Sequence, residues 1–209
     1  MSLRNMAALA AACVMSTASA QGEPADVGSS PHAPLIAYTA GPSPQFHFSA
    51  AVAPTDLSRY VGSGGLVERF GIQDPAAHMS AAIASAIAIR KKGRIADSPI
   101  GSGERALGNS GAPGQAPDYT VDVTTLEWEG GYFLDLGWYY GVRYAARVRV
   151  TTSDGVVLRS ADCDIMPGDQ PSAESNEKLL AHNATVMKDK LAIAAKDCLK
   201  ELLHKTRDV

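Results

Sequence analysis

Five histidines are the residues of this chain best suited to acid–base or metal chemistry. They are spread over the sequence at His32, His47, His78, His182 and His204. None of them stands in an HExxH motif or in another close pair at helical ligand spacing, as a zinc-dependent centre would need. The sequence therefore predicts histidines on the surface rather than a metal site or a catalytic base.

Three aspartates gather around a cysteine in the segment ADCDIMPGD. They are Asp162, Asp164 and Asp169. Calcium and magnesium prefer such carboxylate oxygens, but the segment lacks the central glycine and the late glutamate of a calcium-binding loop. We interpret it as a solvated acidic loop.

Serine chemistry is not indicated either. Ser80, Ser85 and Ser160 lack the strand, turn and helix that present a serine nucleophile. The sequence thus predicts a protein that is not an enzyme, with no catalytic residue, no metal and no cofactor.

The first residues of the chain indicate where the protein works. Residues 1–20 contain Arg4, then the apolar run at 6–15, then the small residues STASA before Gln21. This is the order of a cleavable secretory signal peptide, which predicts a periplasmic or secreted protein. The apolar run is too short for a transmembrane helix. As an alternative, LAAAC is a lipoprotein signal, in which case Cys13 carries a lipid and anchors the chain to a membrane.

Cys163 and Cys198 are the two cysteines that remain after cleavage of the signal. In an oxidising compartment an even pair predicts a disulfide, whereas two cysteines without histidine at ligand spacing make a poor zinc site. Cys163 ends a predicted strand and Cys198 lies far along a predicted helix. The bridge therefore requires that the connecting loop runs outward and that the helix returns across the sheet.

Charge and length limit the function further. The 209 residues carry a formal net charge of −3, and this mild acidity argues against nucleic-acid binding, which needs a basic face. We expect a flexible tether at 21–33 and a single α/β domain at 34–209. Glycine, serine and proline make residues 99–117 a mobile loop within that domain.

A first helix is predicted over QDPAAHMSAAIASAIAIRKKG. Asp74 can cap it, Pro75 suits its first position, and the basic residues at 90–92 complement the dipole at its end. Gly93 is expected to close it in the left-handed conformation. One apolar stripe along this helix predicts that it covers a sheet.

Three consecutive antiparallel strands are predicted in the second half of the chain. Apolar and polar residues alternate in DYTVDVTTLEW and in GVRYAARVRV, which indicates one dry and one wet face. Asp154 and Gly155 supply a tight turn into the strand VVLRSADC. A long helix at 174–204 follows. Together these predict an α+β fold with a mainly antiparallel sheet, two helices packed on one face and a long C-terminal helix.

The segments GIQDPAAHMSAAIASAIA, DYTVDV, YYGVRYAARVRVTTSDGVVLRSADC and EKLLAHNATVMKDKLAIAAKDCLKEL resemble an uncharacterised family of bacterial envelope proteins described as lipoproteins. The resemblance covers roughly residues 72–204. It implies a small α/β domain similar to the amino-terminal domain of the Tol-Pal translocation protein, and it implies no activity.

Aromatic residues are concentrated in EGGYFLDLGWYYG, between two predicted strands. The members of this candidate interaction patch are Tyr132, Phe133, Trp138, Tyr139 and Tyr140. They either fold onto the core, because the hairpin is longer than the pattern shows, or form a contact surface for another protein.

The sequence therefore favours an exported, non-enzymatic envelope protein that acts as an interaction or accessory module in the periplasm. Its partner is an unknown envelope protein, bound through the sheet edge or the aromatic hairpin, and a membrane is a partner only if Cys13 is lipidated. The alternative is a periplasmic carrier that holds a small ligand between sheet and helices or under the mobile loop.

Overall fold

The computed structural model describes residues 32–49, 65–97, 99, 116–133, 139–166 and 176–209. Ala33–Val209 form one compact unit. The predicted signal peptide, Cys13 and Asp169 lie outside the described residues, as do most of the predicted tether and mobile loop. No helix in the described part of the chain is long and apolar enough to cross a membrane.

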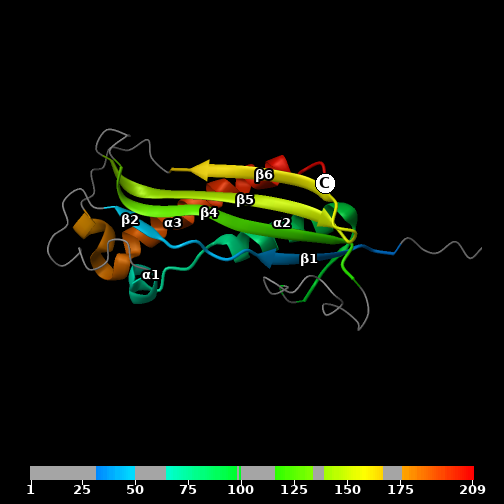
Figure 1. Ribbon diagram of the computed structural model, residues 1–209, viewed down its shortest axis with the longest axis horizontal. Coiled ribbons are helices and arrows are strands. Elements are labelled where there is room, and N and C mark those ends of the chain that lie inside the picture. The colour runs from blue at the N-terminus through cyan, green and yellow to red at the C-terminus, as the bar shows by residue number, and fades with distance from the viewer. Residues whose placement is uncertain (1–31, 50–64, 98, 100–115, 134–138, 167–175) are drawn as a thin grey trace, which may run out of the picture. The chain divides into compact units, whose positions relative to one another are not determined.

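Six strands form one mixed sheet (Figure 1). They are β1 (Leu35–Ala40), β2 (His47–Ser49), β3 (Arg94–Ile95), β4 (Tyr119–Phe133), β5 (Tyr139–Thr152) and β6 (Val157–Ile165). Their order is β3-β1-β4-β5-β6, and β2 also pairs with β4. The strands β4, β5 and β6 are antiparallel neighbours, as predicted from their alternation and turn.

The prediction of a mainly antiparallel sheet is wrong, because the strands β1, β2 and β3 join in parallel. β1 pairs in parallel with both β3 and β4, and β2 pairs in parallel with β4 at residues 129–131. β2 and β3 have only 3 and 2 residues, too few to show an alternating pattern. Their pairing partners also lie far away in the sequence, and local patterns do not show which distant strands pair.

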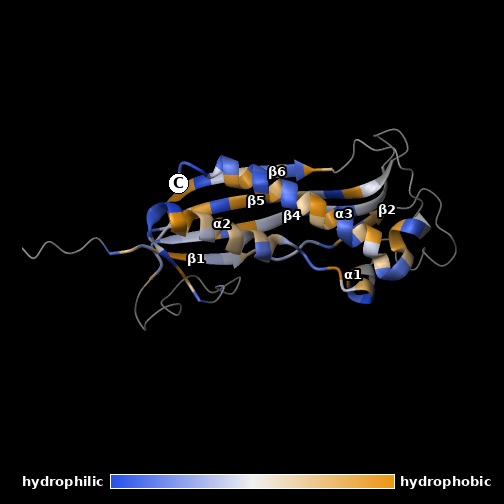
Figure 2. Cartoon of the chain, turned by 180° about the vertical axis from the view of Figure 1, so that it is seen from behind, coloured by the Kyte–Doolittle hydropathy of each residue, from blue (hydrophilic) through white to orange (hydrophobic). Residues whose placement is uncertain are grey.

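Two helices cover one face of the sheet, as Figure 2 shows from the helical side. α2 (Ala76–Lys91) contacts β1 and β4, and α3 (Asn176–Lys205) contacts β5 and β6. The third helix, α1 (Gly65–Phe70), adds the half-buried Val67 and Phe70 to the margin of the core. The prediction of two helices is thus corrected to three, because α1 is too short for its periodicity to stand out in a region rich in glycine and proline.

The core lies between this helical layer and the sheet. It consists of the inward side chains of β4 and β5 and the apolar stripes of α2 and α3. The largest fully buried side chains there include Val121, Val123, Val142, Tyr144, Met79, Ile83, Ile87, Met187 and Leu202. The predicted alternation of both strands is confirmed by this burial.

The ends of α2 follow the sequence signals with two corrections, the first being that Pro75, predicted at the first helical position, is the N-cap residue. Asp74 Oδ1 accepts the N–H of Ala76 at 2.9 Å, so its carboxylate serves the first turn as predicted. At the other end Lys92, not Gly93, takes the left-handed conformation, with φ 53° and ψ 36°. Gly93 is needed for a different reason: a Cβ on it would lie 2.4 Å from the carbonyl oxygen of Pro34.

α3 is not the continuous helix that its spacing predicts. It begins at Asn176, and His182, Asn183 and Ala184 interrupt it with φ of 51°, 63° and 57° in the left-handed region. The Thr185 hydroxyl donates to the His182 carbonyl at 2.6 Å where the helix resumes. The apolar stripe bridges this break without a change of step, so hydrophobic periodicity alone could not reveal it.

Candidate functional site

The disulfide Cys163–Cys198 joins the last strand to the last helix. The two Cα atoms lie 5.4 Å apart, and the cysteines are 2% and 0% exposed. The predicted pairing is thus confirmed: α3 returns across the sheet and presents Cys198 to β6. The bridge fixes β6, the outermost strand on this side, against the helical layer.

The face of the sheet opposite the helices is charged. Because side chains alternate along a strand, the residues between the buried positions of β4, β5 and β6 point to this open face. They include Asp122, Glu127, Glu129, Arg143, Arg147, Arg149, Asp162 and Asp164. An open face of this kind can recognise a partner through charge and shape rather than through apolar area alone.

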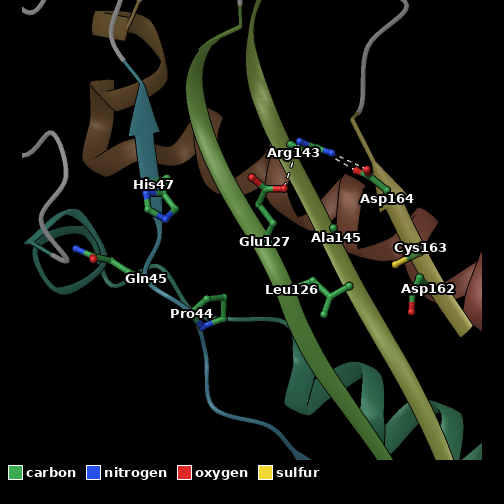
Figure 3. Close-up of a pocket in the computed structure, with 10 residues that line it drawn as sticks. All are labelled: Pro44, Gln45, His47, Leu126, Glu127, Arg143, Ala145, Asp162, Cys163 and Asp164. Atoms are coloured by element: carbon green, nitrogen blue, oxygen red, sulfur yellow. Dashed lines mark hydrogen bonds and ion pairs between the residues drawn. The ribbon is translucent and has the colours of Figure 1, made fainter. Parts of the chain in front are cut away.

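A β-bulge hollows this open face. The register between β4 and β5 shifts between Thr125 and Glu127, which leaves Leu126 unpaired and 42% exposed. The resulting groove has a volume of about 400 Å³, as Figure 3 shows with its lining side chains. Its lining residues are Pro44, Gln45, His47, Leu126, Glu127, Arg143, Ala145, Asp162, Cys163 and Asp164.

Arginine–aspartate pairs organise the charges of the groove. Arg143 donates to both carboxylate oxygens of Asp164 at 2.9 and 2.7 Å. Arg147 binds both oxygens of Asp162 at 2.7 and 2.8 Å. These bidentate bonds lower the pKa of each aspartate, so both stay ionised at neutral pH.

Glu129 is the carboxyl group of this face with the opposite behaviour. Burial raises its pKa, the nearby Glu127 carboxylate raises it further, and Arg143 opposes both effects. Arg143 Nη1 lies 3.2 Å from Glu127 and 3.6 Å from Glu129. His47 lies opposite Glu129 in the pairing of β2 with β4. The single guanidinium of Arg143 therefore interacts with three carboxyl groups.

A polar relay lies on the buried side of the same bulge. Thr125 Oγ1 donates to Asp74 Oδ1 at 2.6 Å and lies 3.0 Å from the Tyr144 hydroxyl. Ser43 also donates to Asp74. Because the Thr125 hydroxyl gives its one proton to Asp74, the Tyr144 hydroxyl is the donor of the bond between them, and burial raises the pKa of Tyr144. The relay ties the start of α2 to β4 and β5.

The histidines, aspartates and serines considered for catalysis or metal binding do not form a common site in the described residues. All five histidines are exposed, as expected. Asp162 and Asp164 do not form a solvated loop, since both lie within β6 and pair with arginines. The three serines are also separate, and Ser80 donates to the carbonyl oxygens of Thr39 and Val121. Among the described residues, no three His, Cys, Asp or Glu side chains are placed to hold a metal ion.

The aromatic segment is described only in part. Trp138 lies outside the described residues, whereas the other four patch residues lie within strands. Tyr132 pairs with Tyr140, and Phe133 pairs with Tyr139. The hairpin is therefore longer than its pattern showed, and a role of these rings in binding stays a prediction.

The arginine–aspartate pairs were missed although a signal existed. The arginines and the aspartates lie at even spacing on consecutive antiparallel strands, so each row had to share one face. The turn at Asp154 and Gly155 fixes the register approximately and places the two rows side by side. The bulge at Leu126 had no such signal, because TLEW continues the alternation on either side.

Comparison with known proteins leaves the family open. No family model matches the sequence, and no curated protein matches it. A protein of the DUF330 family from Xanthomonas campestris is similar over 85% of this chain and 86% of that chain, with 13% identity and a TM-score of 0.35. A PelC dodecamer from Paraburkholderia phytofirmans is similar over 78% and 88%, with 14% identity and a TM-score of 0.29.

At these scores neither likeness bears on the function of the chain. The similarity to the amino-terminal domain of the Tol-Pal translocation protein is not shown by these comparisons. It stays a prediction from the resemblance.

Proposed function

We propose that this protein is an exported, non-enzymatic accessory module of the cell envelope that binds another protein through the uncovered side of its sheet. The observation that carries the proposal is the contrast between the two faces. One face is closed by α2, α3 and a disulfide, whereas the other presents a charged groove and the outer edge of β6. This design holds a binding surface rigid, which limits the entropy lost on association.

Export is supported by two independent features. Residues 1–20 have the composition of a secretory signal, and disulfides persist mainly in oxidising compartments. The chemistry of the open face also favours binding over catalysis. Arg143 and Arg147 hold Asp164 and Asp162 in bidentate pairs that lower the pKa of both aspartates, so neither carboxylate is poised to accept a proton at neutral pH.

The carrier alternative has a narrower basis. In the described residues a packed core of apolar side chains lies between the sheet and the helices. The groove itself has a volume within the range of small-molecule sites, but its lining is rich in charge rather than apolar. Native mass spectrometry of the periplasmic protein separates the two ideas, since a carrier retains a small mass and an interaction module does not.

Site-specific crosslinking tests the proposed function. A photoreactive residue in place of Leu126 reports on the groove, and one in place of Ile89, 79% exposed on α2, reports on the helical side. We expect a discrete protein adduct in the envelope from position 126 and none from position 89. Adducts of equal yield from both positions, or from neither, would contradict binding through the uncovered side.

A further inference from the structure

β6 leaves one long edge of the sheet open. It has 9 residues and, among the described strands, pairs only with β5, whereas the strand at the other end of the sheet, β3, has 2 residues. An outermost strand exposes a row of backbone N–H and C=O groups that another strand can use. Short edge strands and β-bulges limit this outcome; β6 is not short, and its register with β5 shifts once, at Leu158.

The end of α3 protects the middle of this edge. Lys205 Nζ donates to the backbone carbonyl of Asp162 at 2.7 Å, and Arg159 Nε donates to the Lys205 carbonyl at 2.7 Å. A lysine over the edge is a common protection against strand addition. The end of α3 therefore contacts β6 at Arg159 and at Asp162, and it leaves Val157 and Leu158 at the start of the strand exposed.

The residues at the start of β6 are apolar. Val156, Val157 and Leu158 are 54%, 50% and 45% exposed, three consecutive large apolar residues at the entrance to the strand. Other large apolar residues on the described surface occur singly, which is normal. Such a run of apolar residues on an edge strand is typical of a site where another strand is added.

Backbone direction shows which residue can bond a new strand. Because the Asp162 carbonyl is bound by Lys205 from outside the sheet, the main-chain groups of Asp162 point outward. Successive residues of a strand alternate in direction, so Ser160 also turns its N–H and C=O outward. Ser160 lies opposite Arg149 in the β5–β6 pairing.

Arg149 supplies the charge that defines the partner. Arg143 and Arg147 on the same face bind aspartates of β6, but Arg149 lies opposite an uncharged serine. Across β4, the Asp122 carboxylate instead accepts the hydroxyls of Thr39 and Thr124 at 2.6 and 3.0 Å. Within the described residues Arg149 forms no ion pair, and its side chain is exposed.

We infer that the partner adds an extended segment to β6 along residues 156–160, with apolar side chains on Val157 and Leu158 and an acidic side chain that crosses Ser160 to bind Arg149. The inference rests on the proposed function and names the chemistry of its partner. Main-chain bonds to β6 give affinity, and the carboxylate gives register.

A second copy of this chain fits this edge less well. The carboxylates on its β6, Asp162 and Asp164, are already held in bidentate pairs. Lys205 of each copy would also shorten the length over which two such edges could pair, because it occupies the carbonyl of Asp162. The partner is therefore a different protein with an acidic and apolar extended segment.

Synthetic peptides test the inference on the full chain with its disulfide intact. The probe is a capped, fluorescently labelled nonapeptide that alternates valine and threonine around a central glutamate, and its control has lysine at the centre. We expect the glutamate peptide to bind about tenfold more tightly by fluorescence anisotropy, as one charge-assisted hydrogen bond provides. Arg149→Glu should reverse this preference.

Variants at Ser160 separate strand addition from simple charge attraction. Ser160→Pro removes an outward N–H, which an edge strand tolerates, and should weaken the glutamate peptide at least about tenfold. Ser160→Ala keeps the N–H and should bind as the parent does. An unchanged melting temperature shows that each variant is folded.

Equal binding of both peptides, or binding that Ser160→Pro leaves unchanged, would overturn the inference. Self-association that Ser160→Pro abolishes in light scattering would also overturn it, because the occupant would then be a second copy. Crosslinking from position 126 is independent of this edge, so a persisting adduct would leave the proposed function intact when the peptide experiment fails.

Discussion

Thr125 is a hydroxyl residue on the buried face of β4, where Val121 and Val123 precede it. It bonds Asp74 at the start of α2 and Tyr144 on β5, so one side chain links three elements. A buried polar group that loses its partner costs more than a hydrogen bond that is lost together with both partners. This asymmetry leads to a prediction about the relay.

Thr125→Val leaves both Asp74 and the Tyr144 hydroxyl without this partner, and we expect a loss of about 1 to 3 kcal/mol in the free energy of unfolding. Tyr144→Phe removes one donor and keeps the bond from Thr125 to Asp74, so its loss should be smaller, about 0.5 to 1.5 kcal/mol. Urea denaturation measures both. A larger loss for Tyr144→Phe than for Thr125→Val would mean that Thr125 is not the residue that links Asp74 to Tyr144.

Glu129 and Asp164 should respond to pH with opposite signs. Burial raises the pKa of Glu129, so the folded state holds this proton to higher pH and stability falls as pH rises through that range. Arg143 lowers the pKa of Asp164, so its contribution is present above the unfolded pKa and is lost as pH falls.

Glu129→Gln should therefore be more stable than the parent at pH 7, and Asp164→Asn less stable. The Glu129 difference should shrink as pH falls below about 4.3, the ordinary glutamate pKa, where this group is protonated in both states. The Asp164 difference should begin to shrink only below about pH 3.9, the ordinary aspartate pKa, as pH falls toward the lowered pKa of the folded state. Thermal unfolding between pH 3 and pH 7 checks the two slopes. If the two stability differences changed with pH in the same direction, the pKa values of Glu129 and Asp164 would not be shifted in opposite directions.

The break in α3 shows the limit of prediction at the level of the element. The ends of α2 were predictable, since Asp74 and the basic residues at its end act locally. The break in α3 was not predictable, because apolar residues recur every three or four positions on both sides of it. Three consecutive left-handed residues cost energy that only their tertiary surroundings can offset.

Glycine substitutions distinguish a break from a continuous helix. His182 is exposed and has φ 51°, so His182→Gly should stabilise the protein by up to about 1 kcal/mol. Lys196→Gly, at an exposed position in the regular part of α3, should destabilise it by about 1 kcal/mol. Chemical denaturation compares them. A loss at both positions would mean that α3 is helical throughout.

At the scale of the whole molecule, the sequence predicted the antiparallel strands β4, β5 and β6, the two covering helices and the disulfide. Each follows from a strong local pattern or from the even pair of cysteines. The parallel strands β1, β2 and β3 were beyond reach, because only long-range pairing to β4 defines them. The groove was hidden for the same reason, since it forms where the segment at 44–47 approaches the bulge of β4.

The disulfide should contribute much of the stability of this arrangement. It closes a loop across a sequence separation of 35 residues, for which we expect about 2 to 4 kcal/mol. Denaturation with and without reductant measures this difference. No change on reduction would mean that packing alone holds α3 on β6.

Export with an oxidised cysteine pair is the claim on which the functional account depends. Intact-mass analysis of the endogenous protein, before and after reduction, tests it most directly. We expect a chain that begins at Gln21, carries no lipid and gains two hydrogen atoms on reduction, as a Cys163–Cys198 bridge requires. A polypeptide that retains residue 1 and has both thiols free to alkylate would contradict the account.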